Sequence, residues 1–254
     1  MKRPPWIGYS SVRISIRKSD LSIGPGDGRR GGMAARRKPR DEARRARTDV
    51  YRSHIVEAAE QVFAERGFAQ AKLQDISRLA GLSMGTIYAI FPSKTALYRT
   101  ILEERGRELL ELARQVAGRK APPAEALDAL IGLYIDYFVA HPAFLRMHLR
   151  AGTSWAIAPS GTEAQVEHWR DIHALQADIF RRGVAAGVFV DEDPAYLARL
   201  FSALDQVLLA DWVASGMKAD RDALVRRLRS QVERSFRRAA RAPAPRHTAT
   251  FISA

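Results

Sequence analysis

Apolar residues recur at helical spacing along most of the chain. Over residues 52–66 they stand at i, i+3, i+4, i+7 and i+8, which predicts an amphipathic helix that ends at Gly67. Two short helices are predicted next, at 73–80 and 83–90. Longer helices are predicted at 93–118, 124–140, 143–151, 162–186, 194–215 and 221–241. The only strand-like run, Val188 to Val190, is too short to change an all-α prediction.

The two short helices have the order of a helix-turn-helix, in which the second helix enters the major groove of DNA. Gly81 lies between them and can adopt the positive φ that a sharp turn needs. Ser83 is a suitable N-cap for the second helix. Ile76 and Ile87 are placed to pack the two helices together, and the small Ser77 allows close approach. The pattern therefore predicts a DNA-binding element.

We predict an all-α protein with an N-terminal three-helix helix-turn-helix DNA-binding domain at residues 49–98. A helical C-terminal ligand-binding and dimerisation domain is predicted at 99–241. Residues 1–48 hold Gly, Pro and Arg clusters and are expected to form a disordered basic arm, and 242–254 a disordered tail. Met33 follows two glycines and precedes a basic run, so we interpret residues 1–32 as lying upstream of the natural start, which N-terminal mass spectrometry tests.

Positive charge is concentrated at the two ends of the chain. The formal net charge is +13. Residues 1–52 contain 15 Lys and Arg against 5 Asp and Glu, and residues 226–254 contain 8 against 1. Such ends can bind phosphates by counterion release without reading a sequence. The alternative is that they only keep the protein solvated.

Residues 52–98 resemble the DNA-binding domain of the tetracycline-repressor (TetR/AcrR) family. The resemblance rests on AERGF, DI, AGLS, GTIY and FPSK, which occur in that order within RSHIVEAAEQVFAERGF and LQDISRLAGLSMGTIYAIFPSKTALY. It implies a transcription regulator in which a long helical domain follows and forms a homodimer on operator DNA. Ala71 and Lys72 depart from the small hydroxyl residues usual in the family, so the predicted cap of the 73–80 helix is weak.

The resemblance also implies roles for individual residues. Gly85 allows close approach of the backbone to DNA, Thr86 and Tyr88 donate hydrogen bonds to phosphates, and Lys94 contacts phosphate. Helix N-termini at Ser83 and Ser93 present N–H groups to an anion, and Lys94 adds a positive charge at the same end, which supports these roles physically. The predicted DNA-binding residues are Lys72, Gln74, Ser83, Met84, Gly85, Thr86, Tyr88 and Lys94.

The C-terminal region offers aromatic, Met and His side chains for a pocket between helices. The predicted pocket residues are Phe138, Phe144, Met147, His148, Trp155, Trp169, His173 and Phe180. Each is also suited to an ordinary core. An unidentified small molecule is the expected effector, and it releases the repressor from DNA if ligand and DNA favour different separations of the two recognition helices. Activation is the open alternative.

Two apolar stripes near the C-terminus predict a dimer interface. Their members are Leu200, Leu204, Leu208, Trp212, Leu224, Leu228 and Val232. The family resemblance places an intersubunit four-helix bundle there. A two-fold symmetric dimer requires a roughly palindromic operator.

Several function classes are disfavoured. The chain has no Cys, which excludes disulfides and zinc-thiolate sites and fits the cytoplasm. It lacks an apolar run long enough for a membrane span. His168 and His173 are five positions apart, so they do not share one helix face as a metal-binding pair at i and i+4 would. The sequence contains no catalytic or cofactor motif. We therefore expect no enzyme, cofactor or metal. The alternatives are a nucleic-acid-processing enzyme, or a protein that binds anionic membranes through Arg226 to Arg241, which liposome sedimentation tests.

Overall fold

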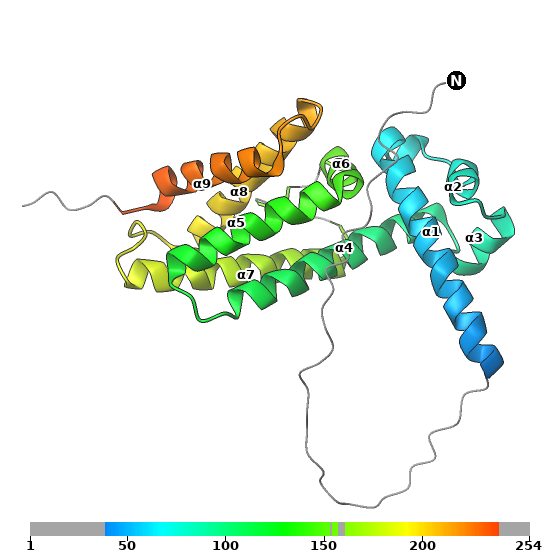
Figure 1. The fold of residues 1–254 in the computed structure, drawn as a ribbon, viewed down its shortest axis with the longest axis horizontal. Helices are drawn as coiled ribbons and strands as arrows, with labels where there is room; N and C mark the ends of the chain where they lie inside the picture. Colours follow the sequence, from blue (N-terminus) through cyan, green and yellow to red (C-terminus); the bar gives the residue numbers. More distant parts are fainter. Residues whose placement is uncertain (1–38, 153, 157–160, 239–254) are drawn as a thin grey trace, which may run out of the picture. The chain divides into compact units, whose positions relative to one another are not determined.

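The computed structural model describes residues 39–152, 154–156 and 161–238, and within these ranges the chain is α-helical (Figure 1). Every helix predicted from the apolar spacing is present, which confirms the all-α fold class. The helices are α1 (Pro39–Gln70), α2 (Leu73–Ala80), α3 (Met84–Ile90), α4 (Lys94–Ala117), α5 (Pro123–Ala140), α6 (Pro142–Arg150), α7 (Glu163–Ala185), α8 (Pro194–Ala214) and α9 (Arg221–Phe236). The predicted arm before Pro39, the start at Met33 and the tail at 242–254 lie outside the described residues.

The first helix differs from the prediction at its start. It begins at Pro39, so residues 39–48 are helical although we predicted them as part of a disordered arm. The run is rich in Arg and Ala, which favour a helix even where the side chains from Asp41 to Val50 are exposed. Gly67 has φ 72° and ψ 167°, which lie outside the helical range, so the regular helix stops there as predicted. After this kink a further helical stretch extends to Gln70.

The last helix ends at Phe236, five residues earlier than predicted from the stripe at 221–241. An isolated antiparallel bridge there joins Phe189 to Arg237. The Val190 N–H donates to the Phe236 carbonyl at 2.9 Å, and the Arg238 N–H donates to the Val188 carbonyl at 3.2 Å. The short apolar run after α7 therefore pairs with the chain that follows α9.

We call α1 to α3 with the first turns of α4 the head, and the rest of α4 through α9 the body. The head has its own buried cluster, in which Ile55, Phe63, Ile76, Ile87 and Leu97 are fully covered. Met147 from α6 also belongs to this cluster. It was predicted to line a ligand pocket, but its side chain instead packs into the core of the head, so that prediction is corrected.

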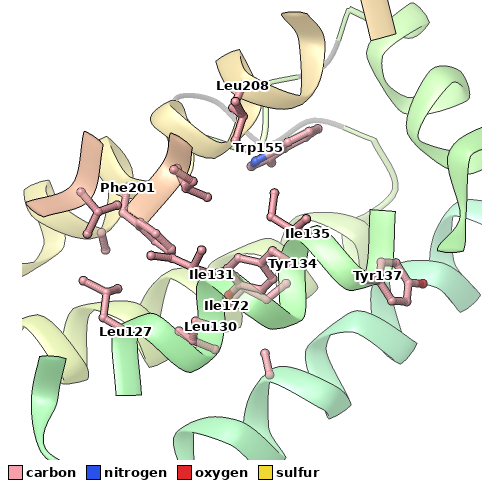
Figure 2. Close-up of a cluster of buried hydrophobic side chains, with 14 of the residues drawn as sticks. Leu127, Leu130, Ile131, Tyr134, Ile135, Tyr137, Trp155, Ile172, Phe201 and Leu208 are labelled. Atoms are coloured by element: carbon pink, nitrogen blue, oxygen red, sulfur yellow. The ribbon is translucent and has the colours of Figure 1, made fainter. Parts of the chain in front are cut away.

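The body is built around α5, whose apolar side chains meet those of α7 and α8 (Figure 2). Phe201 and Leu208 approach from α8, and Ile172 from α7. Tyr137 points away from this group, towards α4 (Figure 2). Its hydroxyl donates to the Arg105 carbonyl at 2.9 Å.

The predicted dimer residues divide into two sets. Five of them are buried in the core of this chain: Leu208, Trp212, Leu224, Leu228 and Val232. Their assignment to a dimer interface is corrected, because α8 and α9 cover these side chains against the body itself. Leu200 is exposed and Leu204 is half-buried.

A different face of α8 remains uncovered. It carries apolar residues at i, i+4, i+7, i+11, i+14 and i+18, namely Tyr196, Leu200, Ala203, Val207, Ala210 and Ala214. All six are exposed or half-buried, and Val207 is 60% exposed. We call these six residues the α8 stripe.

The described residues form neither a membrane-spanning helix nor a metal-binding cluster. None of the helices there combines the length and apolarity that a bilayer crossing requires. No group of three or more His, Asp or Glu side chains in the same ranges is arranged to hold a metal ion.

Candidate nucleic-acid interface and ligand site

The turn between α2 and α3 has the predicted geometry. Gly81 has φ 67° and ψ 25°, the left-handed conformation that glycine adopts without strain. Ile76 and Ile87 are both fully buried and pack the two helices together. Lys72 stands at the N-cap of α2 without a side-chain hydrogen bond, which confirms the predicted weak cap.

Ser77 holds this turn more directly than its small size suggested. Its hydroxyl donates to the Leu82 carbonyl at 2.6 Å, and its own carbonyl accepts the Leu82 N–H at 3.1 Å. The Gly81 N–H also points to the Ser77 carbonyl. Ser77 therefore closes the turn from both its backbone and its side chain, and the sequence pattern alone did not reveal this.

The N-terminus of α3 is capped by a pair of hydroxyl groups. The Ser83 oxygen accepts the Thr86 N–H at 3.1 Å, and the two side-chain oxygens lie 2.9 Å apart. The predicted N-cap is confirmed. Both hydroxyl groups still face the solvent side of α3, because Ser83 is exposed and Thr86 is half-buried.

The outer face of α3 brings several predicted DNA-binding residues together. Gly85 is exposed, and Tyr88 is 53% exposed, which is unusual for a tyrosine beside a packed core. Met84 is half-buried at the first position of the helix. A Cβ atom on Gly85 would meet only the Ser83 Oγ, at 3.8 Å, so the protein itself does not require glycine there. Lys72 and Gln74 are exposed at the start of α2.

Lys94 is engaged with the protein. Its Nζ donates to the carbonyls of Phe68 at 2.7 Å, Ala69 at 3.3 Å and Ala71 at 2.9 Å, and it lies 4.6 Å from the centre of the Phe68 ring. Because an ammonium group has three N–H donors, these carbonyls use all of them. The phosphate contact implied by the family resemblance stays a prediction, but in this structure the side chain ties the end of α1 to the start of α4.

The head and the body are joined by ion pairs along α4. The Arg105 Nε lies 2.7 Å from the Glu60 Oε1, and Arg52 pairs with Glu104 at 2.6 Å. Glu60 is only 6% exposed. Burial opposes the charged form of Arg105, but the hydrogen bond and the charge of Glu60 raise the pKa of Arg105 above its ordinary value. A buried, doubly bonded ion pair of this kind fixes the orientation of α1 on α4.

A cavity of about 700 Å³ lies between the end of α1, α4, α6 and the start of α7. Of the eight predicted pocket residues, Phe144, His148 and Trp169 line it. Trp155 stacks on Trp169 at 5.5 Å and on Phe138 at 5.7 Å, so these two form a second layer behind the wall.

The remaining predicted pocket residues lie elsewhere. Phe180 packs against Phe189 and Phe236 in the body core, and His173 is half-buried and hydrogen-bonded to the Trp155 backbone. Phe68 and Tyr98, which also line the cavity, come from the head and were not predicted. No sequence signal pointed to them, because they are far from the other wall residues along the chain.

Buried polar side chains gather inside the body, away from the cavity. Ser202 donates to Gln176 at 3.0 Å, and Gln176 donates to the Tyr134 hydroxyl oxygen at 3.2 Å. Asp205 is 3% exposed, and its Oδ1 accepts no hydrogen bond from a described residue. Burial raises the pKa of Asp205 to about 7.

Comparison with known proteins agrees with this geometry. Residues 55–101 match the family model described as bacterial regulatory proteins, tetR family. The HTH-type transcriptional repressor NicS of Pseudomonas putida is 32% identical over 102 residues, which are 40% of this chain and 48% of that protein. The match therefore spans about half the length of NicS.

One further relative and one solved structure of similar fold extend the likeness into the body. The HTH-type transcriptional repressor SCO4008 of Streptomyces coelicolor is 30% identical over 149 residues, which are 58% of this chain and 71% of that protein. The crystal structure of the transcriptional regulator FadR from Bacillus subtilis, in complex with stearoyl-CoA, has a TM-score of 0.59 and 20% identity. It covers 71% of this chain and 96% of FadR.

Proposed function

This chain belongs to the tetR family of bacterial regulatory proteins, and on that premise we propose that it is a transcriptional repressor that a small molecule releases from operator DNA. The observation that carries the proposal is the outer face of α3. It presents Gly85 and the exposed Tyr88 next to a left-handed turn at Gly81 that sets the angle between the two short helices. A repressor of this kind acts in the cytoplasm.

For DNA binding, we assign the N-terminal half of α3 to the major groove, which is about 12 Å wide. Gly85 lets the backbone approach DNA, and Met84 lies beside it. Thr86 and Tyr88 donate to phosphates, and the free N–H groups at the Ser83 cap favour an anion in the same position. Lys72 and Gln74 reach the sugar-phosphate backbone of the DNA from α2, and they position the head without reading bases.

For assembly, we propose a homodimer formed through the α8 stripe. An apolar surface that runs the length of a 21-residue helix is costly to leave in water. Small residues at Ala203, Ala210 and Ala214 allow a second helix to approach closely. A two-fold axis through this surface pairs two heads, so the operator is expected to be a palindrome.

For ligand control, the cavity of about 700 Å³ supports the proposal because it falls in the size range of small-molecule sites. An effector can release the operator only through a difference in its affinity for the two states. A tenfold loss of DNA affinity requires about 1.4 kcal/mol of such coupling.

The first experiment finds the operator. Genomic fragments that bind the purified full chain are selected and sequenced, and binding to the recovered site is then measured by fluorescence anisotropy against random duplex. We expect an inverted repeat that binds at least about a thousandfold tighter than random DNA. Equal affinity for all duplexes at moderate salt would refute the proposal.

The second experiment tests the face of α3. Gly85→Ala places a Cβ only 3.8 Å from the Ser83 Oγ, which is ordinary contact, so the helix should gain roughly 0.5–1 kcal/mol. Gly132→Ala in α5 is the matched control, because its nearest atom, the Arg221 Nη2, is also at 3.8 Å. We expect both variants to fold, and only Gly85→Ala to lose operator affinity, by tenfold or more. Unchanged affinity in Gly85→Ala would show that α3 does not approach DNA through this residue.

A further inference from the structure

The aromatic and apolar side chains that line the cavity come from both parts of the molecule. The head supplies Phe68 and Tyr98, and the body supplies Leu102, Phe144 and Trp169. Behind Trp169 the stacked Trp155 ring completes a wide aromatic wall. Such a surface favours a flat apolar occupant, since rings pack on rings by stacking and edge contacts.

The interior of the cavity carries no charge at neutral pH. Burial lowers the pKa of His148 to about 4, and it also lowers the pKa of His168. Both imidazoles are therefore neutral. The charged lining side chains are Arg99 and Glu163, which have opposite signs and are both exposed. An ionised group placed among the rings would lose its hydration, and Arg99 and Glu163 offset little of that loss because both are exposed to water.

One wall residue is left uncovered although it is strongly apolar. Phe68 is 37% exposed, while its ring lies 4.9 Å from Tyr98 and 6.1 Å from Phe63. An apolar molecule in the cavity would remove more of the Phe68 ring from water. The chain therefore offers an incomplete aromatic cluster that a ligand can complete.

We propose that this cavity is the effector site, and that its effector is an uncharged, ring-bearing apolar molecule that seats against Phe68 and Tyr98 of the head as well as against Trp169 of the body. The inference rests on the proposed function and names the ligand class for it. Five aromatic or apolar lining side chains, rim charges of opposite sign and a volume of about 700 Å³ favour this class over acyl carboxylates, phosphates and ammonium compounds.

The same contacts give the effector a short route to the DNA-binding element. The Phe68 carbonyl and ring are both held by Lys94, which also binds the Ala71 carbonyl just before α2. A ligand that displaces Phe68 therefore shifts the segment that leads into α2. The head itself forms part of the site, so occupancy and the position of the helix-turn-helix are linked through direct contact.

The test compares three naphthalene probes of nearly equal shape on the purified full chain, by isothermal titration calorimetry at pH 7.5. They are 2-naphthol, which is uncharged, 2-naphthoate, and the 2-naphthylmethyl trimethylammonium ion. We expect 2-naphthol to bind at least about tenfold tighter than either ion, because an unpaired charge inside the cavity loses hydration. Equal affinities, or no binding of 2-naphthol at millimolar concentration, would overturn the proposal.

A cavity-filling variant locates the binding. Ala151 is exposed, lies at the end of α6 and lines the cavity, so Ala151→Phe should fill the space without disturbing a core. Ala174→Phe, at an exposed position of α7 that does not line the cavity, is the matched control. Thermal melts by circular dichroism check that both fold. We expect at least a tenfold loss of 2-naphthol affinity in Ala151→Phe only; equal affinity in the two variants would place the probe elsewhere.

A last arm separates this proposal from the proposed function. Saturating 2-naphthol is added to the complex with the selected operator, and we expect a loss of DNA affinity of at least tenfold that is absent in Ala151→Phe. If the probe binds with the expected selectivity but no operator is ever recovered, the site stands and the repressor proposal fails. If an operator is recovered and 2-naphthol binds without charge selectivity, the repressor stands and the ligand class is wrong.

Discussion

Lys94→Ala removes a side chain that holds three parts of the head together. The Nζ atom donates to three carbonyls, those of Phe68, Ala69 and Ala71, and it lies 4.6 Å from the centre of the Phe68 ring. These carbonyls follow the kink at Gly67, close to the end of α1. A positive charge is also favourable there, because the C-terminal end of a helix dipole is negative.

The contacts of Lys94 set how much free energy of unfolding the variant loses. A hydrogen bond to a charged group contributes about 1.5–3 kcal/mol and an exposed cation–π contact about 0.5–1 kcal/mol. The three bonds share one half-buried ammonium that water can solvate in the variant, so their contributions do not add. We therefore expect Lys94→Ala to lower the free energy of unfolding by about 2 kcal/mol.

Two measurements decide between this structural role and a phosphate contact. Urea unfolding gives the stability, and operator affinity at several salt concentrations gives the slope of log K against log salt. A lost phosphate contact reduces that slope by about 0.9. We expect Lys94→Ala to be destabilised with its slope unchanged. Lys72→Ala is the control, because Lys72 is exposed and its side chain makes no capping hydrogen bond to α2. This variant should keep its stability, and its slope of log K against log salt should fall by about one unit. Full stability with a reduced slope in Lys94→Ala would refute the reasoning.

Three other changes have defined outcomes. Gly81→Val should lower the free energy of unfolding by about 2 kcal/mol in urea melts, because φ 67° strains a β-branched residue. The strain comes from the backbone, since nothing lies within 4 Å of a Cβ atom added at Gly81. Native stability in this variant would mean that the turn adopts another conformation. Asp205→Asn should stabilise the protein more at pH 8 than at pH 5. Burial raises the pKa of Asp205 to about 7, so the wild type loses about 4 kcal/mol of stability in all as pH rises from about 4 to 7. A stability difference in urea melts that does not change with pH would count against this. Val207→Arg should give a folded monomer in sedimentation at micromolar concentration, because Val207 is 60% exposed on the α8 stripe, and a persistent dimer would place the interface elsewhere.

Local features of the sequence were enough to predict the helices and the turn. The Ser83 cap forms as predicted, Ser93 and Asp193 cap α4 and α8 in the same way, and Gly81 takes the left-handed conformation. These features depend on residues at most four positions apart, so a single sequence contains the whole interaction. The exception is the start of α1, where clusters of Arg and Pro obscured the helix-forming run that begins at Pro39.

Features that join distant residues were predicted less well. The phosphate contact of Lys94 stays a prediction, and its partners within the chain, which were not predicted, lie 23 to 26 residues earlier. Met147 was expected in a pocket and packs into the head. Leu228 was expected to face a second copy and is buried in its own body. In each case the residue type was correctly recognised as one that needs a partner, but the sequence does not say which partner.

The sequence by itself determined that the fold is helical, where along the chain each helix lies, which residues must leave water, and that two short helices meet at a glycine. These are consequences of backbone geometry and of the free energy of hydrating apolar groups, which act within a few residues. Only the tertiary structure decided that the broad face of α8 is divided between its own core and an exposed stripe, and that Phe68 and Trp169 share one cavity. Those outcomes depend on how helices cross, and helix crossing is set by the combined packing of side chains that are far apart along the chain.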